Sequence, residues 1–123
     1  MDDFFYKKLE VYHLSKSLVV DVYRFCRTFP LNERNILCSQ VQRAVISVPS
    51  NIAEGMGRMS NRERIHFIEI AYGSLMEVMC QMEIAESLGY IRQEELLSIE
   101  EKVVKISKML SGLRKSIETK HNY

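Results

Sequence analysis

The residues best suited to chemistry gather in one short stretch, the sequence SNIAEGMGRMS at residues 50–60. Two glycines one residue apart, with a carboxylate before them and an arginine after them, look like a phosphate-binding loop. A nucleotide-binding loop of that kind also needs a lysine followed by serine or threonine, and a strand before it. The lysine is missing here, and no strand pattern precedes Gly55 and Gly57. We therefore interpret the stretch as a turn between two helices.

Local signals in the same stretch fit that interpretation. Gly55 is predicted to follow a helix that ends at Ala53 or Glu54 and to adopt the left-handed conformation that such helix ends favour. Ser60 and Glu63 have the spacing of a capping box, which begins a helix. The turn glycines, Gly55 and Gly57, then have a structural rather than a ligand-binding role.

Three arginines, Arg58, Arg62 and Arg64, lie around the start of the helix that follows this turn. A helix N-terminus attracts anions, and arginine side chains contact the phosphates of RNA and DNA. The cluster is thus a candidate contact for nucleic acid. The alternative is a solvated turn that is merely rich in arginine, and both readings stay open on the sequence alone.

A polar stripe precedes the turn on the preceding helix. Its members recur at steps of three and four residues, and they are Gln40, Arg43, Ser47, Asn51 and Glu54. Because the stripe runs beside an apolar one, part of it must be buried or lie at an interface. One interpretation is a binding groove. The interpretation we favour is a satisfied polar network in which Arg43 pairs with Glu69 or Glu77, because buried charges persist only when paired.

No pattern of metal-binding or catalytic residues stands out. Bundle enzymes of the di-iron type need Glu-x-x-His motifs on two helices, whereas this chain has a single reversed pair, His66 and Glu69. The three cysteines, Cys26, Cys38 and Cys80, lack metal-ligand spacing and suit buried free thiols in a reducing compartment. We expect no enzymatic activity, no metal, no cofactor and no small-molecule substrate.

Apolar residues recur at steps of three and four along residues 11–29, 37–52, 65–82 and 96–117. Asn32 is a plausible N-cap for the second of these helices, with Glu33 in its first turn. Pro49 falls inside that helix and is expected to kink it or to begin a new turn. The sequence predicts an all-α fold, a single domain over residues 1–123. Its helices form an antiparallel up-down-up-down four-helix bundle with the second helix kinked at Pro49.

The third helix carries more apolar surface than a monomer needs. Its predicted buried stripe is Ile65, Ile68, Tyr72, Leu75, Met79 and Met82, yet Phe67, Ile70 and Val78 lie outside it. A helix that is apolar nearly all round must be covered on both sides. We expect that cover to come from other subunits of a homo-oligomer, with Gly73 at a close approach of two backbones.

Composition and charge fit a cytoplasmic protein. Apolar residues make up 46% of the chain and charged residues 27%, with a net charge of +1. No apolar run approaches the roughly 20 residues that cross a bilayer, and residues 1–10 do not have the charge order of a signal peptide. Residues 65–101 hold eight acidic side chains and one basic one, which favours ion pairs between neighbouring helices over a basic binding face.

Several motifs together resemble the bacterial four-helix-bundle family of 23S rRNA-intervening sequence proteins. They span the region from about residue 9 to residue 113. The matching positions are Phe29-Pro30, Glu33, Gln40, Arg43-Ala44, Ser47, Asn51-Ile52-Ala53-Glu54-Gly55, Gly57-Arg58, Ser60, Phe67, Ala71, Gly73-Ser74, Glu77 and Leu88-Gly89.

The resemblance implies a protein with no established catalytic activity. The family is similar to the accessory proteins of diversity-generating retroelements, which form pentamers and bind nucleic acid and a reverse transcriptase. Three hypotheses follow from it and from the residues. The first is a non-catalytic homo-oligomer, a pentamer, that associates with RNA or an RNA-bound complex. The second is a protein-interaction scaffold that does not contact nucleic acid, and the third is an enzyme.

Overall fold

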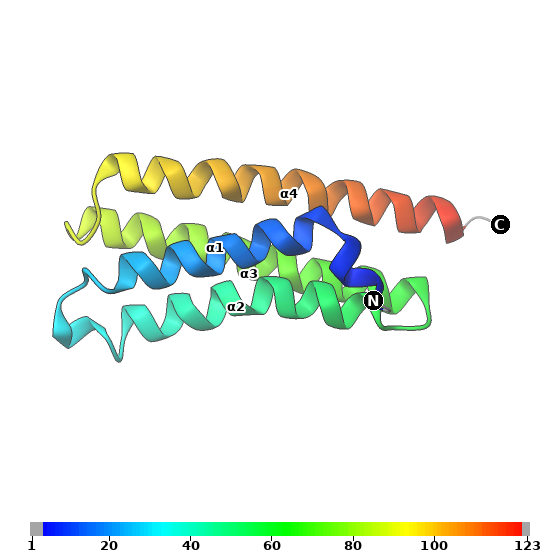
Figure 1. Ribbon diagram of the computed structural model, residues 1–123, viewed down its shortest axis with the longest axis horizontal. Coiled ribbons are helices and arrows are strands. Elements are labelled where there is room, and N and C mark those ends of the chain that lie inside the picture. The colour runs from blue at the N-terminus through cyan, green and yellow to red at the C-terminus, as the bar shows by residue number, and fades with distance from the viewer. Residues whose placement is uncertain (1–3, 122–123) are drawn as a thin grey trace.

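The computed structural model describes residues 4–121, and within that range the chain forms four α helices and two short 3-10 helices (Figure 1). The α helices are α1 (Glu10–Cys26), α2 (Leu37–Met56), α3 (Asn61–Ser87) and α4 (Gln93–His121). The 3-10 helices, η1 (Phe5–Lys8) and η2 (Leu31–Glu33), precede α1 and α2. No β strand occurs in this part of the chain, so the predicted all-α class is confirmed.

The four α helices lie side by side along the long axis of the molecule (Figure 1). Helix α1 packs against α2 and α4, and α3 packs against the same two helices. Across α2 and α3 the partners run in opposite order, because Gln40 contacts Gln81 whereas Ser47, further along α2, contacts Ser74. The α2–α3 turn lies at one end of the bundle, and the other two connections lie at the opposite end. Over the same residues, no helix combines the length and the hydropathy that a bilayer crossing requires.

Buried apolar side chains from all four α helices form one continuous core. Helix α4 shows most regularly how the sequence builds it, since Ile99, Val103, Ile106 and Leu110 recur at steps of four and three and are all buried. Burying one such aliphatic side chain contributes about 1.5–3 kcal/mol to the free energy of unfolding. Their spacing is that of helices packed with a small left-handed crossing.

The buried face of α3 differs from the predicted one. Tyr72 is 42% exposed, whereas Val78, which the prediction left outside the buried stripe, is fully buried. The true stripe is Ile68, Ala71, Leu75, Val78, Met82 and Ala85. The buried stripe includes the small residues Ala71 and Ala85, so a search for large apolar side chains shifts the predicted face towards Tyr72.

The prediction for the start of α2 was wrong. Residues Leu31–Glu33 form the 3-10 helix η2, and α2 begins four residues later, after Ile36, without a side-chain cap. Asn32 is exposed and caps nothing among the described residues. Glu33 is not in the first turn of α2 either, because it belongs to η2, and its carboxylate accepts a 2.6 Å hydrogen bond from the Tyr90 hydroxyl.

Pro49 lies inside α2, which runs without interruption from Leu37 to Met56. Pro49 therefore does not end one helix and begin a separate turn, which was one of the two expected alternatives. Pro49 is buried, and because proline has no backbone N–H, the Val45 carbonyl lacks the donor that an uninterrupted helix would give it. The expected kink at Pro49 stays a prediction.

The end of α3 is fixed by Gly89, the one described residue with a positive φ, of 80°. The Tyr90 N–H donates to the Ala85 carbonyl and the Gly89 N–H to the Glu86 carbonyl, both over 2.9 Å. These two bonds make a Schellman motif, which satisfies the last carbonyls of the helix. The motif places the Tyr90 hydroxyl within hydrogen-bonding distance of the Glu33 carboxylate. This bond links the connection before α2 to the connection before α4.

Candidate functional site

The Gly-rich stretch that opened the sequence analysis is a helix end, a short turn and a helix start. Helix α2 ends at Met56, its C-cap is Gly57 with a φ of −86°, and α3 begins at Asn61. The Glu63 N–H donates to the Ser60 Oγ over 3.1 Å, which confirms Ser60 as the predicted N-cap of α3. The turn thus has an ordinary helix-hairpin geometry.

Gly55 has a different role from the predicted one. It lies inside α2, and its conformation is not left-handed, so the prediction of a C′ glycine there was wrong. A Cβ atom on Gly55 would lie 2.7 Å from the Cβ of Phe67 on α3. The glycine is present because two helix backbones approach closely at this point. Gly57 has more room, since its nearest neighbour would be the Glu54 carbonyl oxygen at 3.4 Å.

Arg58 is half-buried and already has partners. Its guanidinium donates to the Glu54 carboxylate over 2.7 Å and lies 4.6 Å from the centroid of the Phe67 ring. An ion pair at this spacing on a helix surface is a common stabilising contact. The Glu54 carboxylate, a member of the predicted polar stripe, therefore neutralises the first arginine of the candidate cluster.

Arg64 is also engaged, whereas Arg62 is not. The Arg64 Nε donates to the Arg58 carbonyl oxygen and its Nη1 to the Asn61 Oδ1, each over 2.9 Å. Arg64 therefore braces the turn. Arg62 is exposed and has no ion pair with another described residue. The structure brings the three arginines to one end of the bundle but leaves only Arg62 free to contact a ligand.

The predicted polar stripe of α2 is a network between α2 and α3. The Ser47 and Ser74 hydroxyls lie 2.8 Å apart, and the Asn51 amide donates to Ser47 over 2.8 Å. Further along, the buried Gln81 amide donates to Gln40 over 3.4 Å and to Glu77 over 3.1 Å. These members join two helices, as the structural interpretation predicted, but the network is not fully satisfied, because the buried Gln81 Oε1 has no hydrogen-bond partner among the described residues.

Arg43 does not join that network. It is exposed, and the partners expected for it are used elsewhere: Glu77 accepts from Gln81, and Glu69 pairs with Arg114 of α4 over 2.9 Å. The sequence analysis placed Arg43 correctly on α2 but gave it the wrong partners. An outward-facing arginine at this position needs no compensating carboxylate, because water screens its charge.

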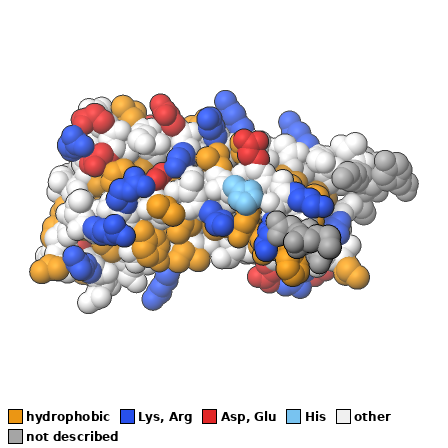
Figure 2. Space-filling view, in the orientation of Figure 1, with side chains coloured by type: hydrophobic (Ala, Val, Ile, Leu, Met, Phe, Trp, Pro, Cys, Tyr) orange, Lys and Arg blue, Asp and Glu red, His pale blue; other side chains and the backbone are white. Residues whose placement is uncertain are grey.

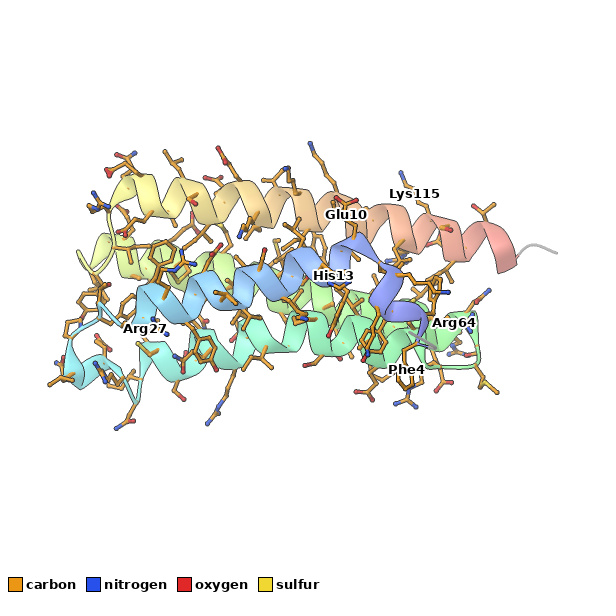
Figure 3. The ribbon with its side chains drawn as sticks, in the orientation of Figure 1. Phe4, Glu10, His13, Arg27, Arg64 and Lys115 are labelled. Atoms are coloured by element: carbon orange, nitrogen blue, oxygen red, sulfur yellow. The ribbon has the colours of Figure 1, made fainter. Side chains whose placement is uncertain are left out.

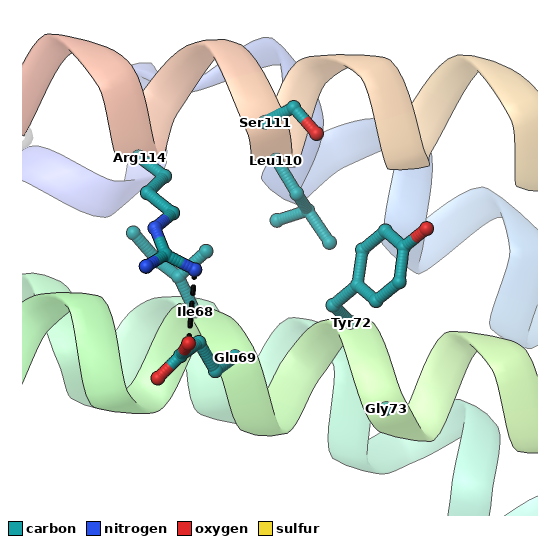
Figure 4. Close-up of a pocket in the computed structure, with 7 residues that line it drawn as sticks. All are labelled: Ile68, Glu69, Tyr72, Gly73, Leu110, Ser111 and Arg114. Carbon is teal, nitrogen blue, oxygen red and sulfur yellow. Dashed lines mark hydrogen bonds and ion pairs between the residues drawn. The ribbon is translucent and has the colours of Figure 1, made fainter.

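The Glu69–Arg114 ion pair crosses a hollow of about 400 Å³ between α3 and α4, shown in Figure 4. The remaining lining residues are Ile68, Tyr72, Gly73, Leu110 and Ser111. Arg114 also bonds to Glu118 over 2.7 Å, and the Glu118 and Glu69 carboxylates raise the pKa of Arg114. Arg114 thus pairs with two carboxylates, Glu69 of α3 and Glu118 of its own helix. Sequence reasoning missed this site because its residues come from two helices.

The cysteines follow the prediction in part. Cys26 and Cys38 are buried free thiols, and the Cys38 Sγ donates to the Cys26 carbonyl oxygen over 3.7 Å. Burial, with a further contribution from Cys38, raises the pKa of Cys26 to about 12. The raised pKa makes Cys26 unreactive, because the thiolate is the nucleophilic form. Cys80 is exposed, so the expectation of three buried thiols was wrong for it.

Basic side chains are not confined to the α2–α3 turn. The face drawn in Figure 2 carries Lys and Arg side chains along the whole length of the bundle, with apolar side chains between them. Exposed members on α1, α2 and their connection are Lys16, Arg24, Arg27, Arg34 and Arg43. In the part of the chain from residue 4 to residue 121, no three His, Cys, Asp or Glu side chains are grouped closely enough to hold a metal ion.

The chain is similar to a protein of unknown function from Bacteroides thetaiotaomicron, described as belonging to the S23 ribosomal protein family. The two share 25% sequence identity and superpose with a TM-score of 0.75. The match covers 85% of this chain and 98% of the other. No curated protein sequence matches this chain.

The sequence model of one protein family matches residues 7–112, nearly the whole of the described helical region. This match agrees with the resemblance found from the motifs around Gln40, Asn51 and Gly55. The chain belongs to the family of 23S rRNA-intervening sequence proteins.

Proposed function

We propose that this chain is a non-catalytic subunit of a homo-oligomer that associates weakly with RNA or an RNA-containing complex in the cytoplasm. The subunit is an antiparallel up-down-up-down bundle, which the opposite order of the Gln40–Gln81 and Ser47–Ser74 contacts supports. The pentamer number comes only from the family resemblance. Paired charges in the α3–α4 hollow and the protonated thiol of Cys26 support a role without catalysis.

The observation that carries the oligomer is the outward face of α3. Ile70, Met76 and Ile84 are 37%, 38% and 44% exposed, and they share this face with Gly73. A Cβ on Gly73 would meet nothing within 4 Å, so no contact inside the subunit explains a glycine in the middle of the helix. An exposed apolar stripe of this kind is typical of a protein interface.

Light scattering at micromolar concentration tests the oligomer. We expect a particle several times the subunit mass of 14.4 kDa. A ring of identical subunits would use the same contact at each interface, so intermediate masses should be minor. A stable particle of 14.4 kDa would overturn the proposal.

The RNA association is proposed for the end of the bundle that carries the α2–α3 turn. Arg62 is the free arginine of the cluster there, and a ring would repeat it once per subunit. Weak contacts repeated in this way add up through avidity. Because phosphate contacts displace bound cations, binding should fall steeply with rising salt and should depend little on base sequence.

A binding titration of structured RNA at low and moderate salt tests this association. We compare the wild type with the Arg58/Arg62/Arg64→Ala variant and with Arg62→Ala alone. The single variant is the sharper comparison, because Arg58 and Arg64 hold the turn together and their loss would disturb its structure. Equal binding by wild type and Arg62→Ala would remove this turn as the contact.

The second candidate function is a protein-interaction scaffold without nucleic-acid contact. The engagement of Arg58 with Glu54 and of Arg64 with Asn61 favours it, since side chains paired within the subunit are less available for phosphate. Absence of any RNA binding by the wild type at low salt would select this scaffold.

A further inference from the structure

A hollow lined by two arginines lies at the end of the bundle opposite the turn that carries Arg58, Arg62 and Arg64. It has a volume of about 250 Å³ and opens where α1 ends and α2 begins. Its lining residues are Tyr23, Cys26, Arg27, Arg34, Cys38 and Gln42. Figure 3 shows Arg27 near this end and Arg64 near the other, so the two sites are separated by most of the length of the bundle.

The arginines of this hollow have no carboxylate partner. Arg27 follows the last turn of α1, and Arg34 follows η2, so two separate elements each contribute one arginine to the lining of the same hollow. Both are exposed, and neither forms an ion pair with a residue between 4 and 121. Most other arginines that ring the bundle differ in this respect, as Arg24 does by pairing with Asp21 over 3.4 Å.

The two acidic residues nearest in sequence are committed elsewhere. Asp21 accepts a 2.5 Å hydrogen bond from Lys102 of α4, and Arg24 is its second partner. Glu33 accepts from the Tyr90 hydroxyl, and that bond raises the pKa of Tyr90. The hollow therefore holds two positive charges that no lining carboxylate offsets.

The rest of the lining suits an anion. The Tyr23 hydroxyl and the Gln42 amide can both donate hydrogen bonds, and neither carries a charge. Cys26 and Cys38 are the buried members of the lining, and the raised pKa of Cys26 keeps its thiol neutral, so that it does not repel a negative group. The end of α1 and the start of α2 contribute partial charges of opposite sign here, so the arginines decide the local potential.

We propose that this hollow binds a phosphoryl group, with Arg27 and Arg34 donating hydrogen bonds to its oxygens. Two arginines that line one hollow from different elements offer enough donors for the several acceptor oxygens of one phosphate. The group can belong to an RNA backbone or to a free phosphate compound, and the chemistry of recognition is the same. The RNA source rests on the proposed function, whereas the anion site itself does not.

Nuclear magnetic resonance on the intact protein tests the site. Inorganic phosphate, pyrophosphate and a short single-stranded oligoribonucleotide are titrated separately at a fixed salt of about 0.1 M, where longer-range attraction is screened. The side-chain Nε–H signals of Arg27 and Arg34 report occupancy. We expect saturable shifts of both signals, and binding weakened about tenfold or more in Arg27→Gln/Arg34→Gln, as for the loss of charge-assisted bonds.

Two matched variants separate a site from general charge. Arg24→Gln removes a basic group on the same stretch of α1 that pairs with Asp21, and Lys108→Gln removes an exposed one on α4. Both should bind phosphate as the wild type does. Phosphate shifts that fail to saturate, or affinity that falls equally in Arg24→Gln and in the double variant, would overturn the site.

The RNA arm keeps this proposal distinct from the proposed function. Oligonucleotide binding that weakens in the double variant supports both. Saturable phosphate binding with no oligonucleotide binding leaves the anion site standing and removes the RNA association. Oligonucleotide binding that is unchanged in the double variant overturns this hollow as an RNA contact and leaves the proposed function in place.

Discussion

Gly55 of α2 lies directly against Phe67 of α3, so closely that a Cβ on the glycine would be 2.7 Å from the Phe67 Cβ. Real Cβ atoms do not approach so closely, and both atoms are fixed by their helix backbones. The α2–α3 contact therefore depends on a missing side chain. A sequence pattern of two glycines suggested a ligand loop, yet this glycine serves the packing of two helices.

Replacing Gly55 by Ala should lower the free energy of unfolding by about 1 kcal/mol. Alanine is intrinsically the better helix former by about 1 kcal/mol, but overpacking in a tight contact costs about 1–3 kcal/mol. Urea unfolding measures the difference. Gly112→Ala on α4 is the control, because a Cβ there meets nothing within 4 Å, and it should stabilise the protein. Two variants that change stability in the same direction would contradict the packing role of Gly55.

Ser60→Ala should destabilise the protein by about 1 kcal/mol, because the Glu63 N–H loses its acceptor at the start of α3. Asn32→Ala provides the matched comparison, since Asn32 has the residue type of a cap but caps no helix in the structure. The free energy of unfolding of Asn32→Ala should stay within about 0.5 kcal/mol of the wild-type value, as for other surface substitutions. A large loss at Asn32 would mean that η2 begins a longer helix than the one described.

Cys26 should make stability fall at alkaline pH. Burial raises the pKa of its thiol from the ordinary 9.0 to about 12 in the folded protein. The unfolded chain therefore releases this proton first as the pH rises above about 9, and the stability present at lower pH is lost between there and about 12. Urea unfolding measures the free energy of unfolding at neutral pH and near pH 10. The decrease between the two pH values should be smaller for Cys26→Ala than for the wild type. An equal loss in both would show that other groups cause the alkaline decline.

Ile84→Glu should dissociate the proposed oligomer. The side chain is 44% exposed on the outward face of α3, where a charge would have to be buried against another subunit. Val104→Glu on α4 is a matched control, because Val104 is 43% exposed. Light scattering should give a lower mass for the first variant only, with unchanged helix content by circular dichroism. Dissociation by Val104→Glu alone would move the contact to α4.

Features set by neighbours in the sequence were predictable. The cap at Ser60 depends on one residue three positions away, and the seam of α4 repeats over Ile99, Val103 and Ile106 without interruption. The ion pair of Glu54 with Arg58 has the spacing of helix neighbours and was available in the same way, although the sequence analysis did not draw it. Local chemistry is enough for such features, because it acts within one or two helical turns.

Features set by distant partners were not predictable. Tyr90 and Glu33 lie 57 positions apart in the sequence, and only the fold shows that the Tyr90 hydroxyl donates a hydrogen bond to the Glu33 carboxylate. The sequence predicts that carboxylate in the first turn of α2. The role of Gly55 depends on Phe67 in another helix, and the pairing of Glu69 depends on Arg114. The hollow between Arg27 and Arg34 likewise needs the path of the connection between α1 and α2. Periodicity indicates that a segment is a helix with a buried face, but it placed that face wrongly in α3 and does not identify the side chains that meet it.

The close approach of α2 and α3 also bears on the order in which the chain folds. These helices are joined by the short turn of residues 57–60, and small groups at Gly55, Ser47 and Ser74 bring their backbones together. Contacts between segments that are near in sequence cost little loop entropy, so they form early. The α2–α3 hairpin is therefore expected to be the first part to assemble, with α1 and α4 docking on it afterwards, and its amide protons should be the last to exchange with solvent.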